Sequence, residues 1–138
     1  MELSQGNEIP NGETLFRYCL PSAFPQDQKE IPVSIFQIEK ELSCDWKKFR
    51  NDPRTSHHVI EKRNRVISIL VCEKIKNPTN PKRNGAPVPD WKQDIIYSPI
   101  TAEEDLIHGE NKAHSLIKGP KKIAICNIIS QCSSWEDV

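Results

Sequence analysis

The sequence predicts an α+β fold, a small and mainly antiparallel sheet with short helices on one face. Runs of β-branched and aromatic residues alternate with polar breaks, which is typical of strands joined by turns. Eleven prolines and only five glycines indicate many irregular connections. Only one late segment has the periodicity of a helix. The length of 138 residues fits a single domain over 1–138.

The strands are predicted from apolar and β-branched runs. The clearest is 66–72, Val-Ile-Ser-Ile-Leu-Val-Cys, which is suited to burial on both faces. We therefore expect it at a central position in the sheet. Further strands are expected at 13–20, 42–44, 93–100 and 113–117, and an extended segment or helical turn at 33–38.

Helix starts are predicted where a side chain can cap exposed amide groups. Asp45 is placed to cap a short helix at 46–50, and Thr55 or Ser56 one at 57–60. Thr101-Ala102-Glu103-Glu104 matches a capping box, which predicts a helix or turn. The final helix starts at Gly119-Pro120, and its apolar stripe comprises Ile125, Ile128, Ile129 and Cys132.

Three segments are predicted to lack regular structure. Residues 1–12 have the composition of a flexible leader, and 133–138 that of a polar tail. Residues 77–90 are rich in proline and asparagine and form a long loop, with Trp91 anchoring its far end. Loops of this length are often lids or binding loops.

Charge is segregated along a chain that has no net charge. Residues 1–46 hold three basic and eight acidic side chains, 47–92 hold twelve and four, and 93–138 hold four and seven. The basic middle either neutralises its flanks on the folded surface or forms a face for phosphate or nucleic acid. A pI of 6.9 argues against a dedicated nucleic-acid binder, because affinity comes from accumulated cationic contacts.

Cysteine and histidine spacing argues against metal chemistry. The five cysteines are odd in number and widely spaced, with no Cys-x-x-Cys pair, so neither a disulfide framework nor structural zinc is expected. The four histidines lack chelating spacings, so we predict no metal and no cofactor. No signal peptide and no membrane-spanning run are recognisable, and we expect a cytoplasmic protein that does not bind membranes.

Three residues are the best candidates for catalysis. His114 can act as acid or base near neutral pH, or can be a half-buried ring bonded to a backbone carbonyl. Arg17, between two aromatic residues, could hold a phosphate or carboxylate. Asp45 could pair with a histidine or serve only as a helix cap. Cys44 lies in an apolar run, which is typical of inert packing.

A second set of residues is predicted to form a binding surface. Cationic side chains cluster at 50–65, and two tryptophans could provide stacking platforms for bases. The alternative is a set of solvated helix faces with the tryptophans in the core. The set comprises Arg50, Arg54, Arg63, Arg65, Trp46 and Trp91.

Three short segments stand out by their order along the chain. They are Leu15-Phe16-Arg17, Leu42-Ser43-Cys44-Asp45-Trp46 and Ala113-His114-Ser115-Leu116-Ile117, the last preceding a C-terminal helix. This order resembles that of a group of small bacterial proteins of unassigned function. The resemblance implies a bacterial origin and no particular activity, and the loop at 77–90 departs from the pattern.

No segment contains a complete active-site motif. Together with the segregated charge and the long loop, this favours a non-enzymatic interaction or regulatory module of a bacterial operon that binds a protein partner. One alternative is a small enzyme acting on a phosphate-containing substrate, with His114 as acid or base and Arg17 as anion holder. Another is nucleic-acid binding through 50–65. The oligomeric state is not predicted.

Overall fold

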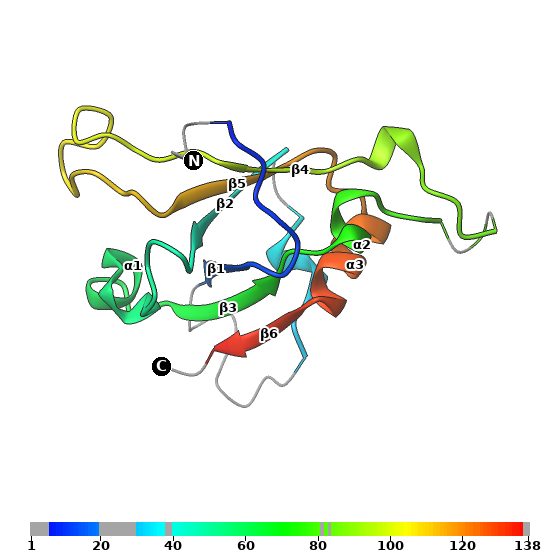
Figure 1. Ribbon diagram of the computed structural model, residues 1–138. Coiled ribbons are helices and arrows are strands. Elements are labelled where there is room, and N and C mark those ends of the chain that lie inside the picture. The colour runs from blue at the N-terminus through cyan, green and yellow to red at the C-terminus, as the bar shows by residue number, and fades with distance from the viewer. Residues whose placement is uncertain (1–5, 20–29, 38–39, 81, 83, 137–138) are drawn as a thin grey trace.

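The computed structural model describes residues 6–19, 30–37, 40–80, 82 and 84–136. Its framework is a six-stranded antiparallel sheet in the order β4-β5-β2-β1-β3-β6 (Figure 1). The strands are β1 (Thr14–Cys19), β2 (Glu41–Trp46), β3 (Arg65–Leu70), β4 (Asp94–Tyr97), β5 (His114–Lys118) and β6 (Ser133–Glu136). The α-helices are α1 (His57–Ile60), α2 (Glu73–Lys76) and α3 (Ile123–Gln131), with 3-10 turns η1 (Val33–Ile35), η2 (Pro53–Thr55) and η3 (Pro89–Trp91). The predicted α+β class is confirmed.

β1 and β2 occupy the middle of the sheet. All six residues of β1 pair with β3, from Thr14 opposite Leu70 to Cys19 opposite Arg65. β3 is therefore interior, as its apolar run predicts, although it lies one strand from the edge. It ends at Leu70 because the chain turns at Cys72 into α2, which the sequence did not predict.

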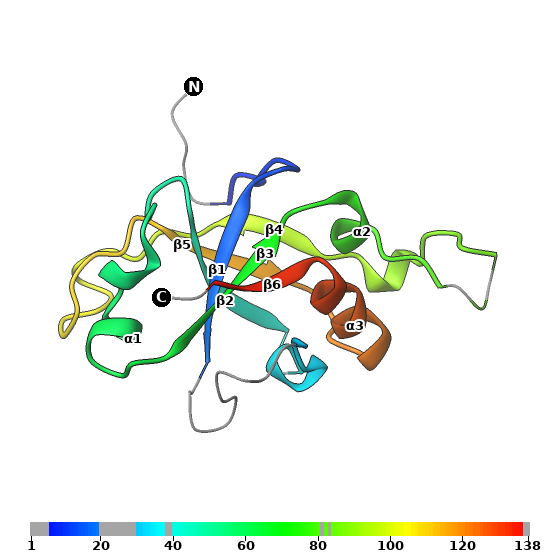
Figure 2. The ribbon, with the colours of Figure 1, turned by 90° about the horizontal axis from the view of Figure 1, so that it is seen from below.

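The helices gather at two opposite ends of the sheet. α2 and α3 lie beside each other at one end and α1 lies at the other, in both views (Figure 1, Figure 2). The predicted stripe of α3 is present, since Ile125 and Ile129 are fully buried and Ile128 and Cys132 pack partly against the core. They belong to one hydrophobic core with strand residues that include Leu15, Leu42, Ile67, Ile69 and Ile117.

Residues 6–12 belong to the fold, so for them the prediction of a flexible leader is wrong. The backbone NH of Gly6 donates to Tyr97 O at 2.7 Å, and that of Ile9 donates to Ile95 O at 2.9 Å. Ile9 is completely buried because its side chain fills the core beside β4. Residues 1–5 lie outside the described part of the chain.

Residues 133–136 form strand β6, so the prediction of a polar tail is wrong there. Their sequence, Ser-Ser-Trp-Glu, is polar apart from the tryptophan, and it pairs with β3 so that Ile67 lies opposite Trp135. The Arg65 guanidinium lies 3.6 Å from the centre of the Trp135 ring, and Ser68 donates to Glu136 at 2.8 Å. Residues 137 and 138 are outside the described range.

Asp45 does not cap a helix. It belongs to β2, and residues 47–49 form a turn, so the predicted helix at 46–50 is wrong. By contrast, α1 forms as predicted, with the Ser56 hydroxyl accepting from the His58 amide at 3.2 Å. The capping-box hydrogen bonds between Thr101 and Glu104 also form, but on a turn.

In its described residues the segment at 77–90 is a loop up to residue 88, with one isolated bridge between Thr79 and Pro87, and η3 begins at Pro89. Trp91 packs partly against the core at its end, as predicted. At 33–38 the chain forms the helical turn η1, and residue 38 lies outside the described part. Within the described residues, no helix is long and apolar enough to cross a membrane.

Candidate functional site

All four histidines of the chain line one hollow at the α1 end of the sheet. The hollow, of about 580 Å³, lies between α1 and the loop that joins β4 to β5. We call it the four-histidine hollow. Its lining includes His57, His58, His108 and His114, together with Arg17, Tyr18, Asp45, Arg50, Glu61, Asp105 and Asn111. It therefore contains all three predicted catalytic candidates.

Asp45 is the polar centre of this hollow. Its side chain is 4% exposed. Tyr18 Oη donates to one carboxylate oxygen at 2.8 Å, Asn111 Nδ2 donates to the other at 2.8 Å, and Arg50 Nε lies 2.8 Å from the first. A buried carboxylate needs such partners to stay ionised. Asp45 is thus committed to three side chains, and it anchors the hollow.

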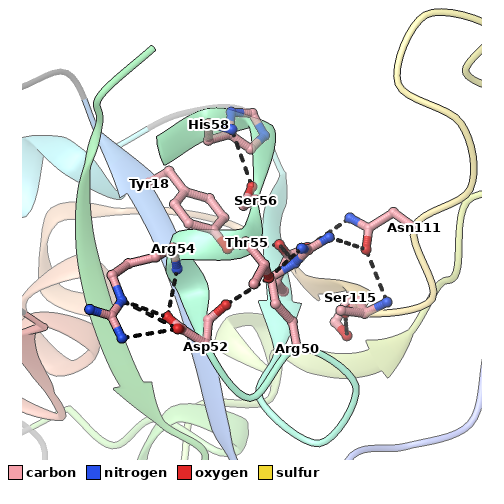
Figure 3. A network of polar contacts seen from close by, with 11 residues as sticks. Tyr18, Arg50, Asp52, Arg54, Thr55, Ser56, His58, Asn111 and Ser115 are labelled. Atoms are coloured by element: carbon pink, nitrogen blue, oxygen red, sulfur yellow. Dashed lines mark hydrogen bonds and ion pairs between the residues drawn. The ribbon is translucent and has the colours of Figure 1, made fainter. Parts of the chain in front are cut away.

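Arg50 and Asn111 connect the loop after β4 to the turn after β2. Arg50 Nη2 donates to Asn111 Oδ1 at 3.3 Å, and Nη1 donates to Thr55 Oγ1 at 3.0 Å. Asn111 Oδ1 also accepts from the amide of Ala113 at 3.0 Å, which orients its own amide group toward Asp45. Figure 3 shows Arg50 reaching between Thr55 and Asn111. These contacts hold the wall of the hollow in place.

Four rings form a stack along one wall. The Tyr18 and His58 ring centres are 4.9 Å apart, those of His58 and His57 4.1 Å, and those of His57 and His108 3.7 Å. Burial, with a further contribution from His57, lowers the pKa of His58 to about 4. Burial also lowers the pKa of His57, as does neighbouring His108. Both shifts favour the neutral form of these two rings, His57 and His58.

The far ring of the stack lies between two carboxylates. His108 Nε2 is 3.4 Å from Glu61, and its Nδ1 is 3.3 Å from Asp105. Asp105 also accepts from the amides of Ile107 and His108, and the amide of His108 lowers its pKa most. This links α1 to the loop that faces it across the hollow.

His114 is oriented by the backbone. Its Nδ1 lies 2.7 Å from the carbonyl oxygen of Ser98, which can only accept, so Nδ1 carries the proton. In the neutral ring Nε2 then has a free electron pair and can accept a proton. In the sheet, His114 of β5 lies opposite Asp45 of β2 in the strand register. The sequence left two possibilities for His114, a ring bonded to a backbone carbonyl and a candidate acid or base. In the structure the ring makes the carbonyl hydrogen bond and also lines the hollow.

Arg17 has donors left over. Its Nη1 donates to Ser43 O at 2.9 Å, while its buried Nε has no hydrogen-bond partner among the described residues. No carboxylate of the described residues lies within ion-pair distance of it. β2 separates β1 from β5, so the backbones of these two strands lie two strand spacings apart, roughly 10 Å. The β1 residue in register with His114, through Asp45 of β2, is Phe16, and Arg17 is the next residue along β1.

The predicted binding surface is largely committed to internal contacts. Arg54 pairs with exposed Asp52 at 3.0 Å, Arg50 serves Asp45, and Arg65 is buried against Trp135. Trp46 is 2% exposed and donates to Glu13, and Trp91 is half-buried. Trp46 therefore offers no open face to a base. Arg63 is exposed, and nucleic-acid binding through 50–65 stays a prediction with less to support it.

The described residues contain no group of three or more side chains suited to holding a metal ion. Cys44 is buried, and that burial raises the pKa of its thiol to about 12, which agrees with inert packing. The sequence did not single out Tyr18 or Asn111, and it did not predict that the histidines converge. The pairing of β2 with β5 brings these segments together, and no local spacing reveals it.

No family model, curated protein or solved structure matches this chain. Its function must therefore be inferred from the chemistry of the hollow itself.

Proposed function

We propose that this protein is a small enzyme that acts on a phosphate-containing substrate in the four-histidine hollow. His114 is the general acid or base, and Arg17 holds the phosphate group. The observation that carries the proposal is the convergence of all four histidines with Arg17 in one concave site. A concave site with a few convergent polar groups is the usual setting for a small ligand.

Arg17 supports the part of the proposal that concerns the anion. Guanidinium groups bind phosphate oxygens through parallel N–H donors. In this protein the other arginines near the hollow are paired, Arg50 with Asp45 and Arg54 with Asp52. Arg17 has only a carbonyl oxygen as its partner among the described residues, so binding an anion would not require an internal ion pair to break.

His114 supports the catalytic part. An imidazole whose Nδ1–H is fixed by a carbonyl presents Nε2 in one tautomer, as a base requires. In the proposed step, Nε2 takes the proton of an attacking water or substrate hydroxyl and returns it to the leaving oxygen. Asp45 acts as a positioning residue, because both of its oxygens already accept hydrogen bonds.

Binding can be tested with inorganic phosphate as the probe. We expect phosphate to raise the Tm of the whole protein and to shift the ring resonances of His114 in NMR. Arg17→Gln should reduce the affinity by about tenfold or more, since a charge-assisted hydrogen bond contributes about 1.5–3 kcal/mol. Arg63→Gln is the matched control and should bind as the wild type does. Equal weakening by both variants would refute Arg17 as the anion holder.

Catalysis can be tested with a panel of phosphate monoesters and diesters. His114→Asn should keep phosphate binding and lose about 10²–10⁴-fold in turnover, which is the usual contribution of a general acid or base. If His114→Asn instead lost phosphate binding, and its turnover fell only as far as the weaker binding explains, His114 would be a binding residue and not an acid or base. No turnover of any phosphate ester by the wild type, despite specific binding, would leave a ligand-binding protein and contradict the enzyme.

A second candidate is the protein-binding module expected from the sequence. Two exposed apolar side chains line the hollow, Ile60 at 66% and Ile107 at 87%, and Leu106, next to Ile107 in the chain, is 88% exposed. Such a group is a candidate contact for a protein partner. When the protein is purified from native cells, a specific partner should co-purify with the wild type. It should also co-purify with Ile123→Asp, which changes an exposed residue at the opposite end. The double variant Leu106→Asp/Ile107→Asp should lose it, and its retention by that variant would contradict this candidate.

A further inference from the structure

Two cysteines meet at the opposite end of the molecule from the hollow. Cys72 is the residue before α2, and Cys132 is the residue after α3. Their Sγ atoms lie 3.4 Å apart. Both side chains are partly exposed, whereas Cys19, Cys44 and Cys126 are buried. Neither lines the four-histidine hollow.

We propose that Cys72 and Cys132 form a redox modification site, which a low-molecular-weight disulfide of the glutathione class converts to an intramolecular disulfide. Cysteine spacing alone predicts no disulfide, and the 60-residue separation of these two cysteines gives no sign in the sequence that they form a pair. The proposal does not depend on the proposed function of the hollow.

The backbone around the pair favours bond formation. Leu70 N donates to Cys132 O at 2.9 Å, and Ile75 N donates to Cys72 O at 3.1 Å, so both residues are fixed at the start or end of an element. A disulfide has an S–S bond of about 2.05 Å, so the sulfurs need to approach by about 1.4 Å. Rotation of the two side chains can supply a movement of that size while the strands and helices stay in place.

The chemistry is thiol–disulfide exchange in two balanced steps. One cysteine loses a proton, and its thiolate attacks a sulfur of the oxidised glutathione, which breaks the glutathione disulfide and releases one glutathione thiolate. The second cysteine, deprotonated in turn, attacks the mixed disulfide and releases the second glutathione thiolate. The two protein thiols are oxidised, and one glutathione disulfide is reduced to two thiols.

Two consequences follow from the surroundings of the pair. Burial and the neighbouring Cys72 raise the pKa of Cys132 to about 11, so its thiolate is scarce at pH 7. The reaction should therefore be slow at neutral pH and faster at pH 9. In the reducing cytoplasm expected from the sequence, the pair would remain as thiols and become linked when oxidised glutathione accumulates.

The test is oxidation of the folded full chain with glutathione disulfide, followed by alkylation, intact mass measurement and peptide mapping. We expect the oxidised chain to be about 2 Da lighter before alkylation, to take up two fewer alkyl groups than the reduced chain under the same conditions, and to give one cross-linked peptide pair joining Cys72 to Cys132. The cross-link should raise Tm by roughly 10 °C, because it closes a long loop of the unfolded chain. Cys72→Ser should abolish the 2 Da loss, and Cys19→Ser is the control that should keep it.

Three results would overturn the proposal. The pair could remain fully open to alkylation after oxidation, or carry glutathione as a persistent mixed disulfide. A cross-link that joins other cysteines would also contradict it. Because Cys72→Ser could itself lower stability, its Tm and circular dichroism without oxidant are compared with those of the wild type before its mass result is interpreted.

Discussion

Two cations at opposite ends of the sheet differ in how completely they are bonded. Lys121 Nζ lies within 3.0 Å of four oxygens, those of Lys40, Gln93, Ile117 and Gly119. Arg17, with five N–H donors, has one hydrogen bond to a carbonyl among the described residues. A saturated cation holds chain segments together, whereas an unsaturated cation can accept a ligand. The difference separates a structural end of the molecule from an end suited to chemistry.

The largest effect is expected for Gly119→Ala at the structural end. Gly119 has φ +151°, and a Cβ there would lie 2.6 Å from the carbonyl oxygen of Lys92 and from the Gln93 amide nitrogen. The backbone would have to move, which would also disturb the oxygens around Lys121. We expect the free energy of unfolding in urea to fall by about 3–4 kcal/mol. Gly12→Ala, with open space around it, is the control and should cost about 1 kcal/mol.

Asp45→Asn tests whether the polar contacts of Asp45 in the hollow also stabilise the fold. The substitution removes the charge that faces Arg50 and replaces one carboxylate oxygen, the acceptor of either Tyr18 or Asn111, by an amide nitrogen that can only donate. Breaking a buried ion pair costs about 3 kcal/mol in unfolding free energy. Asp52→Asn, which breaks an exposed pair with Arg54, should cost under about 1 kcal/mol. If the two variants had equal stability, Asp45 would not anchor the hollow.

Lys121→Met tests the saturated cation directly. The variant keeps a long apolar stem and removes the ammonium donor from the four oxygens, of which that of Lys40 keeps the amide of Gly119, and this should cost about 2 kcal/mol. Lys122→Met changes an exposed neighbour and should be nearly neutral. Phosphate binding at the hollow should be the same in both variants. If Lys121→Met lost phosphate binding while it kept the stability of the wild type, the two ends of the molecule would not have separate roles.

The smallest effect is expected from acidification of the ring stack. The pKa of His58 is about 4 in the folded protein and about 6.5 in an unfolded chain, so below pH 6.5 the unfolded chain takes up a proton that the folded protein does not. Stability should therefore fall as the pH falls from about 6.5 toward 4. Because the ring is partly exposed, screening limits the loss to about 1 kcal/mol between pH 7 and 5.

Urea unfolding at pH 7, 6 and 5 measures this loss, and His58→Phe is the variant that tests its origin. Phenylalanine keeps a ring in the stack and removes the titration, so the decline in stability should become shallower. An unchanged slope in the variant would assign the pH dependence to other groups.

The strands could be predicted where their pattern is local. The segments 66–72 and 113–117 carry β-branched or alternating apolar side chains, and the structure has strands there at Arg65–Leu70 and His114–Lys118. Asp45 was placed at a helix start because an aspartate before a tryptophan and two lysines satisfies the local rule for a cap. Its actual role depends on Asn111 and Tyr18, which are distant in sequence. Strand β6 could not be predicted because three of its four residues are polar, and the strand forms through its pairing with β3.

The candidate site was predicted residue by residue but not as a site. His114, Arg17 and Asp45 were singled out by residue type, and the hollow contains all three. Their meeting requires the β1–β2–β5 order of the sheet, which non-local pairing determines. The contact between His57 and His108 likewise joins α1 to a distant loop. The spacing of the histidines along the chain predicts neither the convergence of His114 with Arg17 and Asp45 nor the contact of His57 with His108.

The backbone hydrogen bonds of residues 6–9 with β4 have a consequence for self-association. Sheets grow when an unpaired border strand recruits a strand from another molecule. At the β4 border that position is already taken by the chain's own N-terminal residues. A shortened version lacking them would present Ile95 and Tyr97 to solvent with free amide and carbonyl groups, and oligomers or fibres would be the expected result.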